Sequence, residues 1–207
     1  MRNYIVEFLG TLLLMFFVGM VVVNPTPLWF APMSIGAILI ALVYAGGPIS
    51  GAHYNPSVTI AFWLRGRIGA KDAIIYIIIQ LAAAIAVSYL VLYMKGFPDD
   101  TQALTPDMDK ILIAEFIGTF VLCYVYLSAF TSQKGAGNSY YGMAVGFAVI
   151  AGSYALANSS GAFFNPTVSF GQSIIEKSSW DNLWIYLVAQ LLAGITAGFT
   201  FKFVEEE

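Results

Sequence analysis

The main shortage in this sequence is charge. Of its 207 residues only 10% are charged, whereas a soluble domain carries roughly 25%. Such a chain has too little polar material to coat a soluble globule. The nine basic and twelve acidic residues give a net charge of −3 and form no basic block. We therefore expect no nucleic-acid partner.

Cysteine and histidine are almost absent. The chain has one cysteine, Cys123, and one histidine, His53. A single cysteine excludes an intrachain disulfide, and two such residues cannot form a His/Cys metal cluster. The apolar segments also contain no Ser/His pair and no carboxylate dyad. We expect no metal, no cofactor and no enzymatic activity.

Long apolar runs are abundant, because 59% of the residues are hydrophobic. A helix needs about 20 apolar residues to cross the ~30 Å hydrocarbon core of a bilayer. Two further apolar segments, 55–64 and 165–175, would reach only about half of that thickness at 1.5 Å per residue. The sequence thus predicts six spans and two half-spans. The predicted spans are 3–23, 33–47, 73–94, 111–131, 140–157 and 182–204.

The sequence repeats itself. Residues 50–62 read SGAHYNPSVTIAF and residues 160–172 read SGAFFNPTVSFGQ. VEFLGTLLL at 6–14 likewise corresponds to AEFIGTFVL at 114–122, and YIIIQLAAAIAVS at 76–88 corresponds to YLVAQLLAGITAG at 186–198. Matching elements in the same order indicate two copies of one unit, 1–98 and 107–207, within a single domain, 1–207.

Each unit has three spans, an odd number, so the second copy must enter the membrane from the opposite side. The repeats are therefore predicted to be inverted. Basic residues favour a cytoplasmic N-terminus and C-terminus, since six then lie inside and three outside. The 95–110 segment would face out. The inside set is Arg2, Arg65, Arg67, Lys71, Lys134 and Lys202, and the outside set is Lys95, Lys110 and Lys177.

The two Asn-Pro pairs are predicted helix starts. A half-helix inside the membrane exposes unpaired N–H groups in its first turn, which hydrocarbon cannot satisfy. Asn is a favoured N-cap and Pro is favoured at the next position. Asn55-Pro56 and Asn165-Pro166 fit this pattern, with Ser57 and Thr167 following.

Inversion would bring both half-helix N-termini together near the bilayer midplane. Each N-terminus carries a partial positive charge of roughly half a unit. With the Asn oxygens used for capping, the amide groups of Asn55 and Asn165 could donate to a solute in the lumen. Two donors and two positive ends suit a neutral solute and repel cations.

These motifs together resemble the aquaporin and glycerol-facilitator family, the major intrinsic proteins, over essentially the full chain. The resemblance implies an all-α membrane protein with six transmembrane helices and two re-entrant half-helices in inverted repeats. It also implies one pore per protomer, a homotetramer and a location in the cell membrane. Lipid, water and small neutral solutes would be the partners.

Three ionisable residues have structural and functional interpretations. Glu7 and Glu115 occupy equivalent positions in the two copies, and a proton-coupled transporter would use such groups. The resemblance instead implies that each accepts hydrogen bonds from the backbone of its re-entrant loop. His53 is expected at the cytoplasmic mouth of the pore, where it would line the wall or act in gating.

The sequence departs from the family pattern at two places. The usual Ala after Asn-Pro is Ser57 in one copy and Thr167 in the other, and we expect their hydroxyls to bond within the first turn. The usual Arg of the outer constriction is Val168. Gapless counting from the Asn residues places the remaining constriction positions at Ile35, Ser153 and Ala162.

Because Ser153 and Ala162 are small and Val168 replaces the arginine, the filter should be wide and apolar. A wide, arginine-free filter predicts a passive channel for water and small uncharged solutes. Glycerol, urea, ammonia and undissociated metalloid acids are the candidates. The alternative is a narrow water-selective pore, in which Ile35 or Phe163 refills the gap left by the missing arginine. An ion-coupled secondary transporter and an ion channel are the other classes considered.

Overall fold

The computed structural model describes residues 1–23, 30–96 and 106–205, and every regular element in those ranges is helical. Most of the 95–110 segment lies outside the described residues. Six helices are long and apolar enough to span a membrane. They are α1 (Arg2–Val22), α2 (Ala31–Ser50), α4 (Ala70–Lys95), α5 (Met108–Thr131), α6 (Tyr141–Ser160) and α8 (Leu183–Glu205).

Two short helices complete the fold. They are α3 (Pro56–Leu64) and α7 (Pro166–Ile174), and a 3₁₀ turn, η2 (Trp180–Asn182), precedes α8. Nine residues of helix extend about 13 Å, which is less than half of a bilayer core. The expected fold class, six spans with two half-helices, is therefore confirmed.

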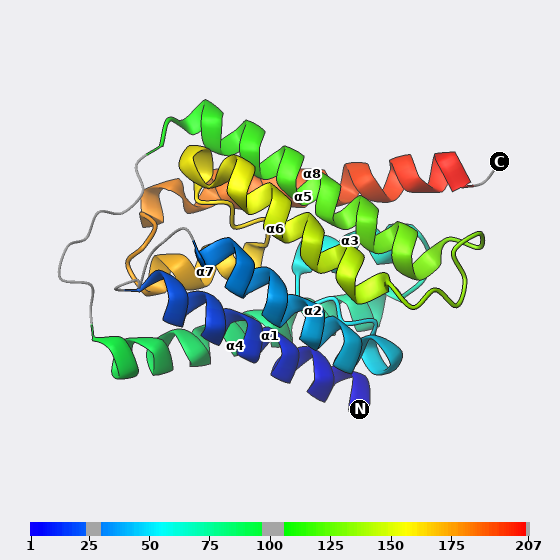
Figure 1. Ribbon diagram of the computed structural model, residues 1–207, viewed down its shortest axis with the longest axis horizontal. Coiled ribbons are helices and arrows are strands. Elements are labelled where there is room, and N and C mark those ends of the chain that lie inside the picture. Colours follow the sequence, from blue (N-terminus) through cyan, green and yellow to red (C-terminus); the bar gives the residue numbers. More distant parts are fainter. Residues whose placement is uncertain (24–29, 97–105, 206–207) are drawn as a thin grey trace.

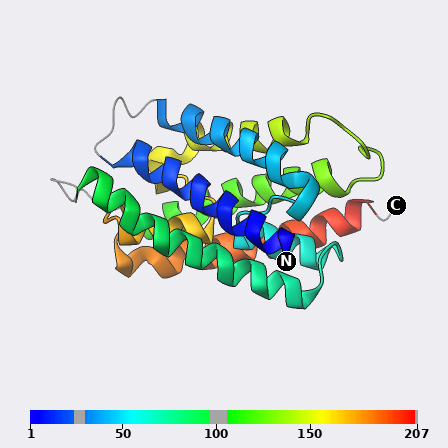
Figure 2. The same cartoon turned by 90° about the horizontal axis from the view of Figure 1, so that it is seen from below.

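The long helices run alongside one another in both views of the bundle (Figures 1 and 2). Helix α1 packs on α2 and α4, α5 packs on α6 and α8, and α2 against α6 joins the two sets. Each half-helix packs on a long helix of the other set, α3 on α8 and α7 on α4. Both described ends of the chain lie toward the same end of the bundle (Figure 1).

The distribution of polarity suits a bilayer. Large apolar side chains such as Ile74, Leu90 and Phe199 are exposed on the long helices. Charged and amide side chains such as Glu7 and Gln80 are fully buried. Apolar groups outside and polar groups inside match a hydrocarbon solvent.

Small residues set how closely the helices approach. A Cβ on Gly36 of α2 would lie 2.9 Å from the Gly146 carbonyl oxygen of α6. A Cβ on Gly194 of α8 would lie 2.5 Å from the Ser57 carbonyl oxygen. Both distances are too short for a side chain, so glycine allows these backbones to touch, as is common in membrane helices. The contact between Gly194 and Ser57 lets the first turn of α3 pack directly on α8.

Candidate functional site

Both half-helices begin at the predicted Asn-Pro pairs. The Asn55 side-chain oxygen accepts a hydrogen bond from Ser57 N at 2.8 Å, and the Asn165 oxygen accepts from Thr167 N at 2.9 Å. Pro occupies the first helical position in each case. In each half-helix the Asn oxygen pairs one first-turn N–H group, and Pro has no N–H group. Fewer backbone donors therefore lie unpaired inside the membrane.

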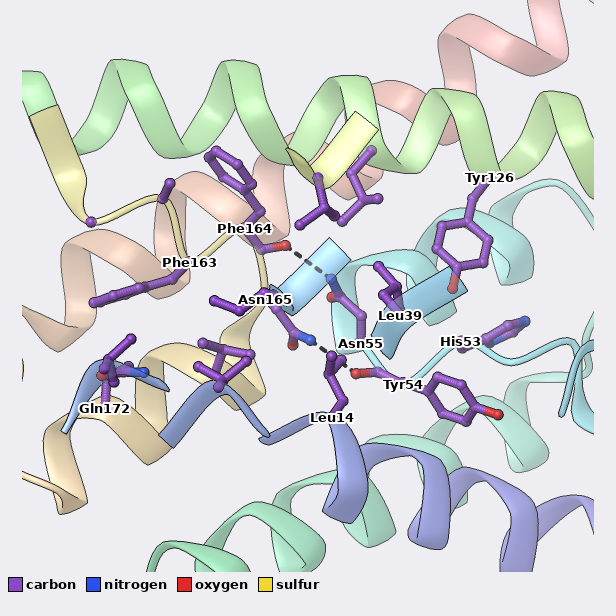
Figure 3. Close-up of a pocket in the computed structure, with 18 residues that line it drawn as sticks. Leu14, Leu39, His53, Tyr54, Asn55, Tyr126, Phe163, Phe164, Asn165 and Gln172 are labelled. Atoms are coloured by element: carbon purple, nitrogen blue, oxygen red, sulfur yellow. Dashed lines mark hydrogen bonds between the residues drawn. The ribbon is translucent and has the colours of Figure 1, made fainter. Parts of the chain in front are cut away.

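The two caps are also bonded to each other's loops. Asn55 Nδ2 donates to the Phe164 carbonyl oxygen at 2.9 Å, and Asn165 Nδ2 donates to the Tyr54 carbonyl oxygen at 2.9 Å (Figure 3). An amide nitrogen carries two N–H groups. Each Asn therefore keeps one N–H for another acceptor after making its cross-loop bond.

The loops before the caps have an unusual backbone. Ala52 and Tyr54 have φ of 50° and 49°, and Ala162 and Phe164 have φ of 55° and 51°. Non-glycine residues seldom occupy this left-handed region. The same alternation in both loops requires external support, because each such residue costs conformational energy.

Glu7 supports the first loop. Its carboxylate accepts from His53 N at 2.8 Å and from Tyr54 N at 2.8 Å. It also accepts from Ser50 Oγ at 2.7 Å and Gln80 Nε2 at 2.9 Å. With four donors around it, this buried carboxylate is engaged in holding the backbone.

Glu115 makes the corresponding contacts in the second loop. It accepts from Phe163 N at 2.9 Å and Phe164 N at 2.7 Å. Ser160 Oγ and Gln190 Nε2 each donate to it at 2.7 Å. Gln80 and Gln190 occupy corresponding places in the two repeated segments, 76–88 and 186–198, and sequence analysis gave them no role. An amide buried in an apolar span needs a partner, and that requirement was the available signal.

Tyrosine hydroxyls donate to carbonyl oxygens at the last residues of α2 and α6 and in the first loop. Tyr76 donates to the Ser50 carbonyl oxygen at 3.0 Å, and Tyr186 donates to that of Ser160 at 2.6 Å. Tyr126 of α5 donates to the Ala52 carbonyl oxygen at 2.7 Å. Sequence reasoning did not identify these three residues.

A cavity of about 70 Å³ runs past the two caps. One water needs about 10–15 Å³ of such space, so several could occupy it. In Figure 3, His53 and Tyr126 lie at one end, Phe163 and Gln172 at the other, and the Asn residues lie between. We call the Phe163–Gln172 end the distal end.

Three of the four expected constriction residues line this cavity, namely Ile35, Ala162 and Val168. Ser153 is buried but is not among the lining residues. Val149, about one turn earlier on α6, lines the wall instead. Gapless counting from Asn165 cannot show which turn of a separate helix faces the cavity.

His53 is packed between aromatic rings. Its ring centroid lies 4.4 Å from that of Phe62 and 5.3 Å from that of Tyr76. Its Nδ1 lies 3.2 Å from Thr59 Oγ1. Among the described residues, no cluster of three His, Cys, Asp or Glu side chains is placed to hold a metal ion.

The hydroxyls of Ser57 and Thr167 do not behave as expected. Both are buried, and neither has a hydrogen-bond partner within the described part of the chain. The first-turn N–H groups of Ser57 and Thr167 are directed to the Asn oxygens. The side-chain hydroxyls therefore do not provide the local bonds that the sequence suggested.

This fold and site define a membrane channel rather than an enzyme. A family model described as major intrinsic protein matches residues 1–201. The chain belongs to the major intrinsic protein family, and it is a membrane channel for water and small solutes.

Similar proteins agree with this assignment. The chain is 32% identical to glycerol uptake facilitator protein-like 6 of Lactiplantibacillus plantarum over 219 residues, which cover both proteins completely. It is 31% identical to a probable aquaporin TIP2-2 of Oryza sativa subsp. japonica, covering 99% of this chain and 87% of that protein. The fold matches the aquaglyceroporin structure from Plasmodium falciparum with a TM-score of 0.83 at 18% identity, over 97% and 95% of the two chains.

Proposed function

We propose that this protein conducts water and small uncharged solutes passively through an arginine-free filter. Glycerol, urea, ammonia and undissociated metalloid acids are the solutes to be tested. The observation that carries the proposal is the position of Val168, which lines the cavity on the first turn of α7. Valine neither narrows the passage as a long guanidinium would nor adds a positive charge to it.

The side-chain amides of Asn55 and Asn165 would form the central hydrogen-bonding site of the pore. Each retains one N–H after bonding to the opposite loop, and each lies at the positive end of a half-helix. A neutral solute with an acceptor oxygen can be bound there and released. A cation meets two positive dipole ends and no carboxylate free to compensate for its lost water.

The buried carboxylates support a passive mechanism. Glu7 and Glu115 each accept four hydrogen bonds from their own loop and its neighbours. A proton-coupled carrier needs carboxylates that can exchange protons along a pathway. Here their protonation would release the backbone that holds the caps.

A narrow water pore is the second candidate. Ile35 and Phe163 both line the cavity, and the Phe163 ring is stacked on Tyr186 with centroids 4.9 Å apart. A fixed ring at the distal end can occupy the space that Val168 leaves. The cavity volume of about 70 Å³ is consistent with a single file of small molecules.

The assembly and orientation are proposed on the family assignment and on charge. We propose a homotetramer in the cell membrane with both termini in the cytoplasm, and inverted repeats over 1–98 and 107–207. Both described ends of the chain lie toward one end of the bundle (Figure 1). The distribution of basic residues favours the cytoplasmic side for that end.

A permeability panel tests the proposal. Purified protein in proteoliposomes is compared with empty liposomes by stopped-flow light scattering for water, glycerol, urea, ammonia and a metalloid acid. We expect flux of water and of at least one larger solute without any ion gradient. Water flux alone would favour the narrow pore, and dependence on an ion gradient would contradict passive conduction.

A further inference from the structure

The distal end of the cavity contains an amide whose donor is unused. Gln172 of α7 lines the cavity and is 1% exposed. Its Nε2 is buried and has no hydrogen-bond partner within the described residues. Since buried donors are nearly always paired, an orphan facing a solute pathway points to a transient partner.

The other polar side chains that line the cavity are hydrogen-bonded. The Tyr54 hydroxyl donates to the Leu42 carbonyl oxygen at 3.2 Å, and that of Tyr126 donates to Ala52. The two Asn amides bond to the loops, and His53 lies within hydrogen-bonding distance of Thr59. Among the described polar side chains that line the cavity, Gln172 therefore differs in having an unpaired donor.

Gln172 lies near Val168, the position where the family usually has arginine. It follows Val168 by four residues, about one helical turn along the same face of α7. Its main chain is fixed, because its carbonyl oxygen accepts from Lys177 N at 2.9 Å and from Ser178 N at 3.2 Å. The backbone from which the amide projects is thus held about one turn beyond Val168.

The corresponding position of the other sequence copy shows that the fold does not require an amide here. That residue is Phe62 of α3, whose ring packs against His53. The second copy thus carries a neutral amide where the first copy has an aromatic ring.

We propose that Gln172 binds the permeating solute at the distal end, through Nε2–H donation to an acceptor oxygen. Water, a polyol hydroxyl and a urea-type carbonyl all offer such an oxygen. The inference rests on the proposed function and extends it. Gln172 supplies, without charge and one turn farther along α7, the hydrogen bond that Val168 cannot make.

The test replaces Gln172 with Leu and, in a second variant, with Met, two apolar residues of comparable size. Ser173→Ala is the matched control, because Ser173 is on the same helix, is buried, and lies outside the cavity lining. The proteoliposome flux of water, urea and glycerol is measured for all four proteins. Water flux is also measured as a function of temperature.

We expect both Gln172 variants to lower the flux of water and of each conducted solute about two- to tenfold, the loss of one net hydrogen bond. The activation energy for water should rise, and Ser173→Ala should match the parent. Equal flux in parent and variants, or a change for glycerol alone, would overturn the role of Gln172 as a donor. A parent that conducts nothing above empty liposomes would overturn the proposed function itself, and this inference with it.

Discussion

Asn55 donates its side-chain hydrogen bond to the carbonyl oxygen of Phe164, the residue that immediately precedes the other cap. The reciprocal bond runs from Asn165 to Tyr54. Each half-helix is therefore positioned by the loop of the other. The two amides consequently depend on both loops, and a change in either cap should be felt across the centre of the cavity.

Asn165→Asp should abolish most conduction while leaving the protein inserted. The carboxylate can still cap Thr167 N, but it cannot donate to the Tyr54 carbonyl oxygen and instead repels it. A buried polar group left unsatisfied costs about 1–3 kcal/mol, and a cost of that size in the conducting conformation would lower flux roughly 5- to 150-fold. Stopped-flow water permeability is the measurement.

Asn182→Asp is the control for added charge, since Asn182 is only half-buried and lies in the turn before α8. It should conduct like the parent. Unchanged selectivity and rate in Asn165→Asp would show that the central amides have no part in permeation.

Glu115→Gln should destabilise the protein. The carboxylate accepts bonds from two backbone N–H groups, one hydroxyl and one amide, and a glutamine replaces one acceptor oxygen with a donor. At least one buried N–H would then lose its partner, at a cost of about 1–3 kcal/mol. Thermal unfolding in detergent should show a lower Tm, whereas Glu176→Gln in the exposed loop should not. Equal melting of both variants would contradict the supporting role of Glu115.

Val168→Arg tests the width of the filter. A guanidinium at this position adds bulk, several donors and a positive charge to the cavity wall. Fluxes of glycerol, urea and metalloid acids should fall well before water flux does, when all are measured in the same vesicles. Val58 occupies the corresponding place on α3 but does not line the cavity, so Val58→Ala, which adds no polar group, is the control. A parent that already excludes all the larger solutes would refute the wide filter and leave the channel assignment standing.

Cysteine labelling tests the orientation. Asp109 and Lys134 are both exposed, and they lie at the two ends of α5, a helix of 24 residues. In a Cys123→Ala background, Asp109→Cys should react with an impermeant maleimide in intact cells and Lys134→Cys should react only after lysis. The native Cys123 is fully buried, so its removal should not affect labelling. The reverse pattern would place the termini outside.

The sequence predicted the helices well because their signals are local. Six apolar runs and two Asn-Pro pairs gave boundaries within a few residues of those observed, including α3 at Pro56 and α7 at Pro166. Capping chemistry needs only two or three neighbouring residues. The family was recognisable for the same reason, since its sequence motifs are short runs of adjacent residues.

The contacts between helices could not be obtained in this way. The donation from Tyr126 to Ala52 and the place of Val149 in the wall depend on helix rotation, which no local pattern encodes. Gln172 was part of the quoted repeat, yet only its burial and its unused donor distinguish it. A comparison of Gln172 with Phe62 in the two copies would have been the available sequence signal.

The bonds of the first loop also indicate the order in which the bundle can assemble during synthesis. Glu7, Ser50, Tyr76 and Gln80 all belong to the N-terminal part of the chain, so the loop before Asn55 can be held once α4 has been made. The Asn55 amide, however, finds its acceptor only in Phe164, 109 residues later. While the ribosome produces α5 and α6, the first half-helix is therefore capped but not yet joined to its counterpart. The cavity wall is completed only when the second loop enters the bundle.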